Sequence, residues 1–170
     1  MAILMLLLAC PAGRAEAVPV ADYVRLHVVA GDDGAAAQAL KLQVRDAVLA
    51  VARELLMDAK DADAAWAIVT REKDALEDAA LQRARACGYT GSVRCETGVL
   101  AFPDRRYGDM VVPAGDYRAL RVLIGPGRGR NWWCVLYPSL CWPGELPPEG
   151  AKPYSILWNW LQGLLGGEAA

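Results

Sequence analysis

The sequence predicts an α+β domain in which a mostly antiparallel sheet carries two or three helices on one face. Three observations support this prediction. Residues 23–30 alternate with the period of a strand, residues 34–86 follow the helical period, and the pattern returns to period 2 after Gly88. At 170 residues, the chain is long enough for one domain with a buried core.

The first expected element is a strand over residues 23–30, with one buried face. Its alternating sets are Val24, Leu26 and Val28 on one side, and Arg25, His27 and Val29 on the other. Residues 31–34 contain two glycines and two aspartates, which break the strand. We expect Asp33 to cap the helix that follows by accepting a backbone N–H bond.

Helices are expected over residues 34–57 and 63–86. The first has apolar residues at helical spacing on one stripe, which are Leu40, Val44, Ala47, Val48, Val51 and Leu55. The polar residues 58–61 separate it from the second region, which can form one helix or two. Gly88 suits the left-handed position that ends a helix.

Five short segments after Gly88 are expected to be strands. They cover residues 92–97, 99–102, 110–112, 117–124 and 132–137, and Gly98 is expected to form a bulge or bend. Residues 142–153 are rich in Pro and Gly and cannot continue a sheet. The predicted domain therefore covers residues 18–142, and residues 143–170 form a linker and an apolar tail that either docks on the domain or contacts a membrane surface.

The start of the chain suggests export. Residues 2–9 are apolar and uncharged, and residues 15–17 supply small side chains at the spacing that signal peptidase reads, so we predict a signal peptide over residues 1–17. Residues 7–10 also fit a lipoprotein box, which would place a lipid anchor on Cys10.

An exported chain would retain four cysteines, and three pairings are possible. We favour Cys87 with Cys95 and Cys134 with Cys141, because each pair closes a short loop. Four buried thiols would be expected only if the chain stayed in the cytosol.

The composition gives little support for catalysis, metal binding or nucleic-acid binding. The net charge is −2, so no strong overall field attracts nucleic acid or an anionic membrane. There is no C-x-x-C spacing for zinc, and His27 is the one histidine. A hydrolase could be drawn from Cys134, His27 and Asn131, but a disulfide-bonded Cys134 is no nucleophile. We expect no cofactor, no metal and no catalytic residue.

A glycine-rich loop leads into two adjacent tryptophans. Residues 125–129 lack the Lys and the following helix of a phosphate-binding loop, so we expect a turn that needs positive φ. Neighbouring residues in a strand face opposite sides, so one tryptophan should enter the core and the other should be exposed or be covered by the tail. The predicted partner-binding residues are Arg128, Arg130, Asn131, Trp132 and Trp133.

Three motifs occur in order between Tyr23 and Cys141. They are RLHVVA at residues 25–30, ALKLQVRDAVL at 39–49, and NWWC at 131–134 after the glycine-rich loop. This pattern closely resembles the stage II sporulation protein R family of endospore-forming bacteria. The resemblance implies a protein that is secreted from the forespore into the space between the forespore and mother-cell membranes. There it would activate a membrane-embedded aspartic-type protease, which processes the precursor of sigma factor E.

The resemblance also bears on single residues. Arg25, His27, Arg45 and Asp46 match the family's motifs, and we expect them to be structural, with an ion pair from the helix to a strand residue. Two other functions stay open. A cell-wall binding module would stack Trp132 or Trp133 on sugar rings, and a thiol-dependent hydrolase would need a free Cys134.

Overall fold

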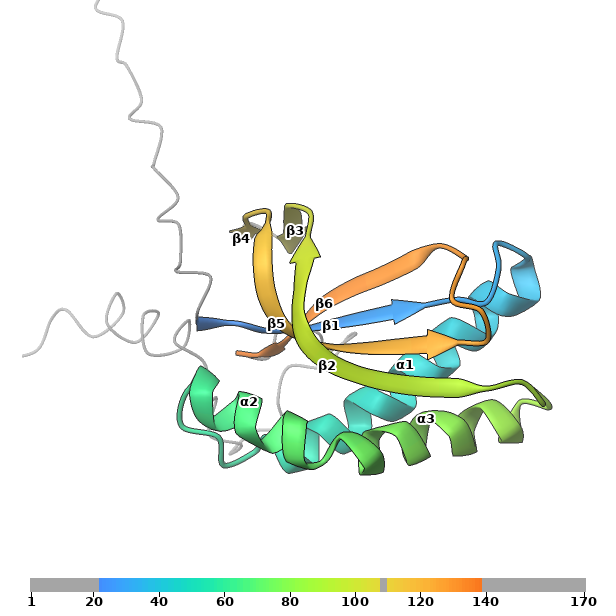
Figure 1. The fold of residues 1–170 in the computed structure, drawn as a ribbon, viewed down its shortest axis with the longest axis horizontal. Helices are drawn as coiled ribbons and strands as arrows, with labels where there is room; N and C mark the ends of the chain where they lie inside the picture. Colours follow the sequence, from blue (N-terminus) through green and yellow to red (C-terminus); the bar gives the residue numbers. More distant parts are fainter. Residues whose placement is uncertain (1–21, 108–109, 139–170) are drawn as a thin grey trace, which may run out of the picture.

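The computed structural model describes residues 22–107 and 110–138 (Figure 1). Its elements are β1 (Val24–Val29), α1 (Ala35–Leu55), α2 (Ala62–Arg71), α3 (Lys73–Ala86), β2 (Val93–Phe102), β3 (Arg105–Tyr107), β4 (Met110–Val112), β5 (Gly115–Ile124) and β6 (Asn131–Tyr137). The predicted signal peptide (1–17), the linker and tail (143–170), Cys10 and Cys141 lie outside the described residues.

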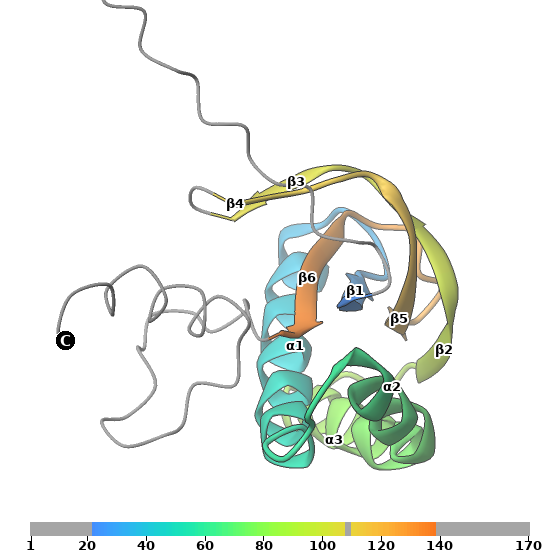
Figure 2. The same cartoon turned by 90° about the vertical axis from the view of Figure 1, so that its left-hand side faces the viewer.

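The main sheet has the strand order β2-β5-β1-β6. β5 pairs antiparallel with β2 and parallel with β1, and β1 pairs antiparallel with β6. Two of the three pairings are therefore antiparallel. The three helices lie on one face of this sheet (Figure 2), so the predicted α+β class is confirmed.

The β3–β4 hairpin forms a separate two-stranded sheet and curls over the face that the helices leave free (Figure 2). It extends from the paired ends of β2 and β5, where Phe102 lies opposite Gly115. We call residues 103–107 and 110–114 the β3–β4 arm. The sequence pattern identified β4 but missed β3, because the three residues of β3 show no apolar alternation.

β1 is buried on both faces, which corrects the expectation of one buried face. Leu26 and Val28 join a core cluster with Val44 and Val48 on the helix side. The opposite side is covered by a second cluster, which we call the aromatic face. Its buried members are Tyr23, Phe102, Val112, Tyr117, Ala119 and Val135, and Leu100, Tyr107 and Trp133 pack against them. The arm and the curled ends of β2 and β5 make this second cover possible.

The helix boundaries follow local capping. Asp61 caps α2 by accepting a hydrogen bond from the Ala64 N–H at 2.7 Å. The prediction that Asp33 caps α1 is wrong. Gly34 is the N-cap residue, and its N–H donates to Asp32 Oδ1 at 2.7 Å. The second helical region divides at Glu72, and Gly88 has a φ of 78°, as expected at the end of α3.

β2 is one continuous strand in unbroken register with β5, so of the two alternatives predicted at Gly98 the bulge is absent; the strand does bend along its length (Figure 1). Gly98 pairs in register with Ala119 on β5, and a Cβ atom added to Gly98 would meet nothing within 4 Å. The glycine therefore leaves the ladder intact.

The loop from β5 to β6 does need its glycines. Gly125 and Gly127 have φ values of 57° and 59°, which confirms the predicted turn with positive φ. Gly129 is required for a different reason, because a Cβ there would lie 2.1 Å from the carbonyl oxygen of Asp32. Its N–H donates to the Ala30 carbonyl at 2.9 Å, so the two backbones pack in direct contact.

We predict that Gly129→Ala lowers the free energy of unfolding by more than about 2 kcal/mol, because backbone must move to admit the methyl group. Gly98→Ala is the matched control and should leave stability unchanged or slightly raised, because its site is open. Chemical denaturation of both variants measures the difference. Equal stabilities would show that the contact between the two loops is dispensable.

Candidate functional site

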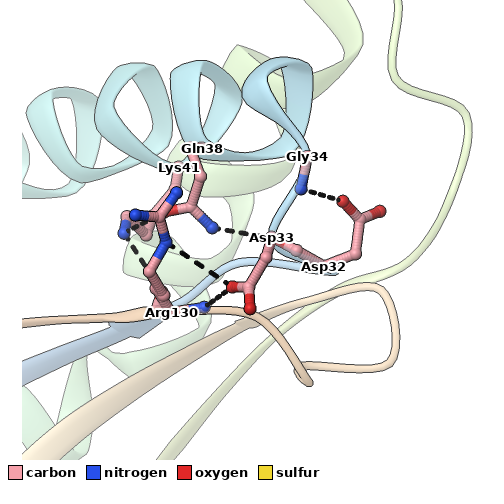
Figure 3. A network of polar contacts seen from close by, with 6 residues as sticks. All are labelled: Asp32, Asp33, Gly34, Gln38, Lys41 and Arg130. Atoms are coloured by element: carbon pink, nitrogen blue, oxygen red, sulfur yellow. Dashed lines mark hydrogen bonds and ion pairs between the residues drawn. The ribbon is translucent and has the colours of Figure 1, made fainter.

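The glycine-rich loop is fastened to the loop between β1 and α1 (Figure 3). The Arg130 N–H donates to Asp33 Oδ1 at 2.7 Å, and Lys41 Nζ donates to the Arg130 carbonyl at 3.0 Å. Asp33 thus accepts its hydrogen bond from the glycine-rich loop and not from the start of α1. The backbone of Arg130, just before β6, is therefore held by hydrogen bonds to Asp33 in the β1–α1 loop and to Lys41 on α1.

Lys41 supports this junction from inside. Its side chain is buried, and Nζ also donates to Gln38 Oε1 at 2.7 Å. Gln38 Nε2 in turn donates to the Asp32 carbonyl at 2.8 Å. Burial lowers the pKa of Lys41, and the nearby Arg130 and Arg45 charges lower it further. Lys41 lies in the motif at residues 39–49, but its buried position could not be predicted from the sequence pattern.

Trp132 and Trp133 point to opposite faces of the sheet, as the strand period predicts. Trp132 packs against the helix-side core, with the Arg45 guanidinium 4.9 Å from its ring centroid. Trp133 lies on the aromatic face, stacked on His27 with 3.7 Å between ring centroids. Both rings are half-buried, so neither is a fully buried core ring and neither is fully exposed, because both faces of the sheet are covered.

Arg25 is the buried centre of the aromatic face. Its Nε donates to the Cys134 carbonyl at 2.9 Å, and Nη2 donates to the Tyr107 hydroxyl at 3.1 Å. The guanidinium lies 4.4 Å from the Phe102 ring centroid and 4.9 Å from that of Tyr117. Burial lowers the pKa of Arg25, while Tyr107 raises it. The cation is stabilised mainly by aromatic rings and oxygen acceptors.

His27 is built into the same face and is shielded from solvent. Nε2 is 2.9 Å from Asn131 Oδ1, and the ring makes an edge contact with Phe102 at 6.1 Å. Burial lowers the pKa of His27, although the bond to Asn131 opposes this shift and the Arg121 charge adds to it. The net effect favours the neutral ring.

The three residues of the conceivable hydrolase are not assembled. The Cys134 side chain packs with the helix-side core, whereas His27 stacks on Trp133 on the aromatic face. Cys134 is also disulfide-bonded, so it offers no thiolate. Its predicted partner, Cys141, lies outside the described residues, and that pairing stays a prediction.

The predicted bond between Cys87 and Cys95 is wrong, because both are free cysteines. The Cys95 N–H donates to Glu77 Oε2 at 2.7 Å, which places Cys95 beside Glu77 on α3. Glu77 precedes Cys87 by about 15 Å of helix, whereas the Cα atoms of a disulfide lie within about 7 Å. Cys87 is exposed at the helix end, and burial raises the pKa of Cys95 to about 12.

Asp46 also departs from expectation. It pairs with its neighbour Arg45 at 2.7 Å and is more than half exposed, so it makes no bridge to a strand. The link from α1 to β6 is made by Arg45 on Trp132 instead. The sequence of α1 does not show whether its link to the sheet is an ion pair of Asp46 or the stacking of Arg45 on Trp132.

The described residues contain no group of three or more His, Cys, Asp or Glu side chains placed to hold a metal ion. None of the helices within these residues is long and apolar enough to cross a membrane. The aromatic residues Tyr107, Phe102 and Tyr117 around Arg25 were missed by sequence reasoning. The sequence offered one indication of them: Arg25 and His27 lie on the same face of a strand, and such a face, if buried, needs side chains that pack against it.

The fold and this centre define a small α+β domain built around a buried arginine, with a fastened basic loop next to a tryptophan pair. The chain belongs to the stage II sporulation protein R family, whose model matches residues 20–145. It is 33% identical over 118 residues to stage II sporulation protein R of Bacillus subtilis (strain 168). The aligned region covers 69% of this chain and 53% of that protein. The chain therefore spans about half the length of this relative. No solved structure matches.

We predict that Asp46→Ala changes the free energy of unfolding by less than about 0.5 kcal/mol, because the exposed pair with Arg45 is weak. A double-mutant cycle of Arg45→Ala and Trp132→Leu should give a coupling energy of about 0.5–1 kcal/mol from the stacked cation. Urea unfolding of the single and double variants measures both values. A larger loss for Asp46→Ala than for Arg45→Ala would restore the ion-pair interpretation.

Proposed function

We propose that this sporulation protein R family member is an exported signal. It would activate a membrane-embedded aspartic-type protease, which then processes the precursor of sigma factor E. Family membership supports a role in sporulation. The fastened basic loop beside the tryptophan pair is the observation that carries the proposal of a protein partner.

The contact surface that we propose consists of Arg128, Arg130 and Asn131, all exposed, with the half-buried Trp132 and Trp133 beside them. The Arg130 side chain is 70% exposed although its backbone is bonded on both sides. A loop that is already fixed loses little conformational entropy on binding, which favours affinity. Arginine and tryptophan are also the residue types that most often dominate protein interfaces.

The site geometry supports a ligand rather than an enzyme. The lone histidine is held between Asn131 and two aromatic rings, and Cys134 is disulfide-bonded on the other side of the sheet. Neither side chain can supply the base and nucleophile of a thiol hydrolase. A cell-wall binding role is less well supported, because Arg45 covers one face of Trp132 and His27 covers one face of Trp133.

We place this activity in the space between the forespore and mother-cell membranes. The predicted signal peptide supports secretion into that space, and Cys10 offers the alternative of a lipid anchor. Either form would bring the contact surface close to a protease in the opposing membrane. The apolar tail, over residues 154–165, could add a peripheral membrane contact.

Co-expression with the candidate protease and the sigma-factor precursor tests the proposal by scoring precursor cleavage. Wild type should trigger cleavage, and the double variant Arg128→Ala/Arg130→Ala should keep its melting temperature but reduce cleavage at least about tenfold. Arg94→Ala is the control, because Arg94 is exposed on β2 at the opposite edge of the sheet.

The stage II sporulation protein R of Bacillus subtilis, tested with its own host's protease and precursor, shows whether the assay reports activation. If that protein triggers cleavage and the wild-type chain does not, the activation proposal is wrong. If the double variant and Arg94→Ala both behave as wild type, the contact surface lies elsewhere on the chain.

A further inference from the structure

The buried guanidinium of Arg25 has one open position. Arg25 is 0% exposed, and Nη1 is buried without a hydrogen-bond partner. Buried polar groups in folded proteins are nearly always bonded, so an unpaired N–H group here requires an explanation. No Asp or Glu within residues 22–107 and 110–138 forms an ion pair with Arg25.

The groups around Arg25 compensate its charge only in part. Phe102 and Tyr117 lie against the guanidinium at 4.4 and 4.9 Å, and rings in this position attract a cation through their electron-rich faces. Phe102 has no oxygen, and the Tyr117 hydroxyl donates to the Pro113 carbonyl at 2.6 Å and makes no hydrogen bond with Nη1. The Cys134 carbonyl accepts from Nε and the Tyr107 hydroxyl accepts from Nη2, while Tyr117 acts on the guanidinium electrostatically. The site thus lacks one negatively charged acceptor.

These features select the chemistry of a ligand. A carboxylate carries a single charge, which matches the single uncompensated cation, and its oxygens are the usual partners of arginine N–H groups. The walls contributed by Phe102, Tyr117 and Trp133 are aromatic and would pack against an apolar stem. A doubly charged phosphate would leave an excess negative charge among these rings.

Access to Arg25 is controlled by the β3–β4 arm. The arm joins β2 and β5 through two short connections, each of which contains a proline, Pro103 and Pro113. The Tyr107 hydroxyl links the arm to the neighbouring β1 and β6 strands, because it accepts from Arg25 Nη2 and donates to the Trp133 carbonyl at 3.3 Å. Lifting the arm would break the bonds of this hydroxyl and withdraw Val112 from the aromatic face, and it would leave the strand ladders of the main sheet intact.

We propose that the aromatic face is a binding site for a carboxylate on an apolar stem, which pairs with Arg25 when the β3–β4 arm lifts. The carboxylate takes the open Nη1 position, and the aromatic walls take the stem. Burial lowers the pKa of Arg25, and the interactions with Tyr107, Tyr117 and Tyr23 oppose this shift. The inference does not depend on the protease proposal, because Arg25 and the β3–β4 arm are not part of that contact surface and only Trp133 is shared between the two.

Titration of the full chain with 3-phenylpropionate, followed by NMR of the arginine side-chain N–H signals, tests the proposal. We expect saturable shifts of the Arg25 signals and no response to the isosteric amide, 3-phenylpropionamide. Tyr107→Ala should bind the acid more tightly, because it removes the hydroxyl that closes the site. Tyr107→Phe removes the hydroxyl but keeps the ring, and its affinity for the acid should lie between those of wild type and Tyr107→Ala.

A second titration distinguishes the source of the carboxylate. N-acetyl-Ala-Phe, with a free carboxyl end, represents a polypeptide terminus, and binding of this peptide alone would assign the site to a chain end. Arg25→Lys retains the charge but not the open N–H geometry, and it should weaken binding at least about tenfold. The proposal is overturned if neither acid binds saturably to wild type and Tyr107→Ala, or if the amide binds as well as the acid.

Discussion

The burial of β1 on both faces is the constraint on which the rest of this structure depends. A central strand with Leu26 and Val28 on one side and Arg25 and His27 on the other needs two different covers. The helices provide the apolar cover, and the β3–β4 arm together with the curled ends of β2 and β5 provides an aromatic cover that can hold a cation (Figure 2). An arginine in the interior is costly unless rings and acceptors surround it, so the aromatic residues have to converge there.

This constraint also positions the basic loop. β6 pairs with β1 in a register that places Trp133 beside His27 and Trp132 beside Val28. The tryptophan pair therefore ties β6 to both covers, and Asp33 with Lys41 fixes the backbone immediately before it. The exposed arginine side chains project from a rigid base. A surface of this kind suits recognition by a partner protein, because its geometry is set before binding.

Much of the fold could be predicted from the sequence, since periodicity reports which residues are buried together in one element. The helices, the turn at Gly125 and Gly127, and the opposed tryptophans all follow from local rules. The second cover of β1 could not be predicted, because it depends on how far β2 and β5 curl. The same limit explains the error at Cys87 and Cys95, where nearness in sequence was taken for nearness in space. Asp33 and Asp46 were misassigned because a carboxylate has several possible donors and sequence does not rank them.

The central claim is that the aromatic face is closed over β1, and His27 reports on it directly. Because the chain has one histidine, its ring signals in an NMR titration have a single assignment. Burial lowers the pKa of His27 below its usual 6.5, so the neutral ring stabilises the fold above that pH, and this contribution is lost as the pH falls through the lowered pKa. We expect titration below pH 6.5, with ring protons shifted upfield by the stacked Trp133. A histidine that titrates at 6.5 or above with unshifted signals would contradict the closed aromatic face.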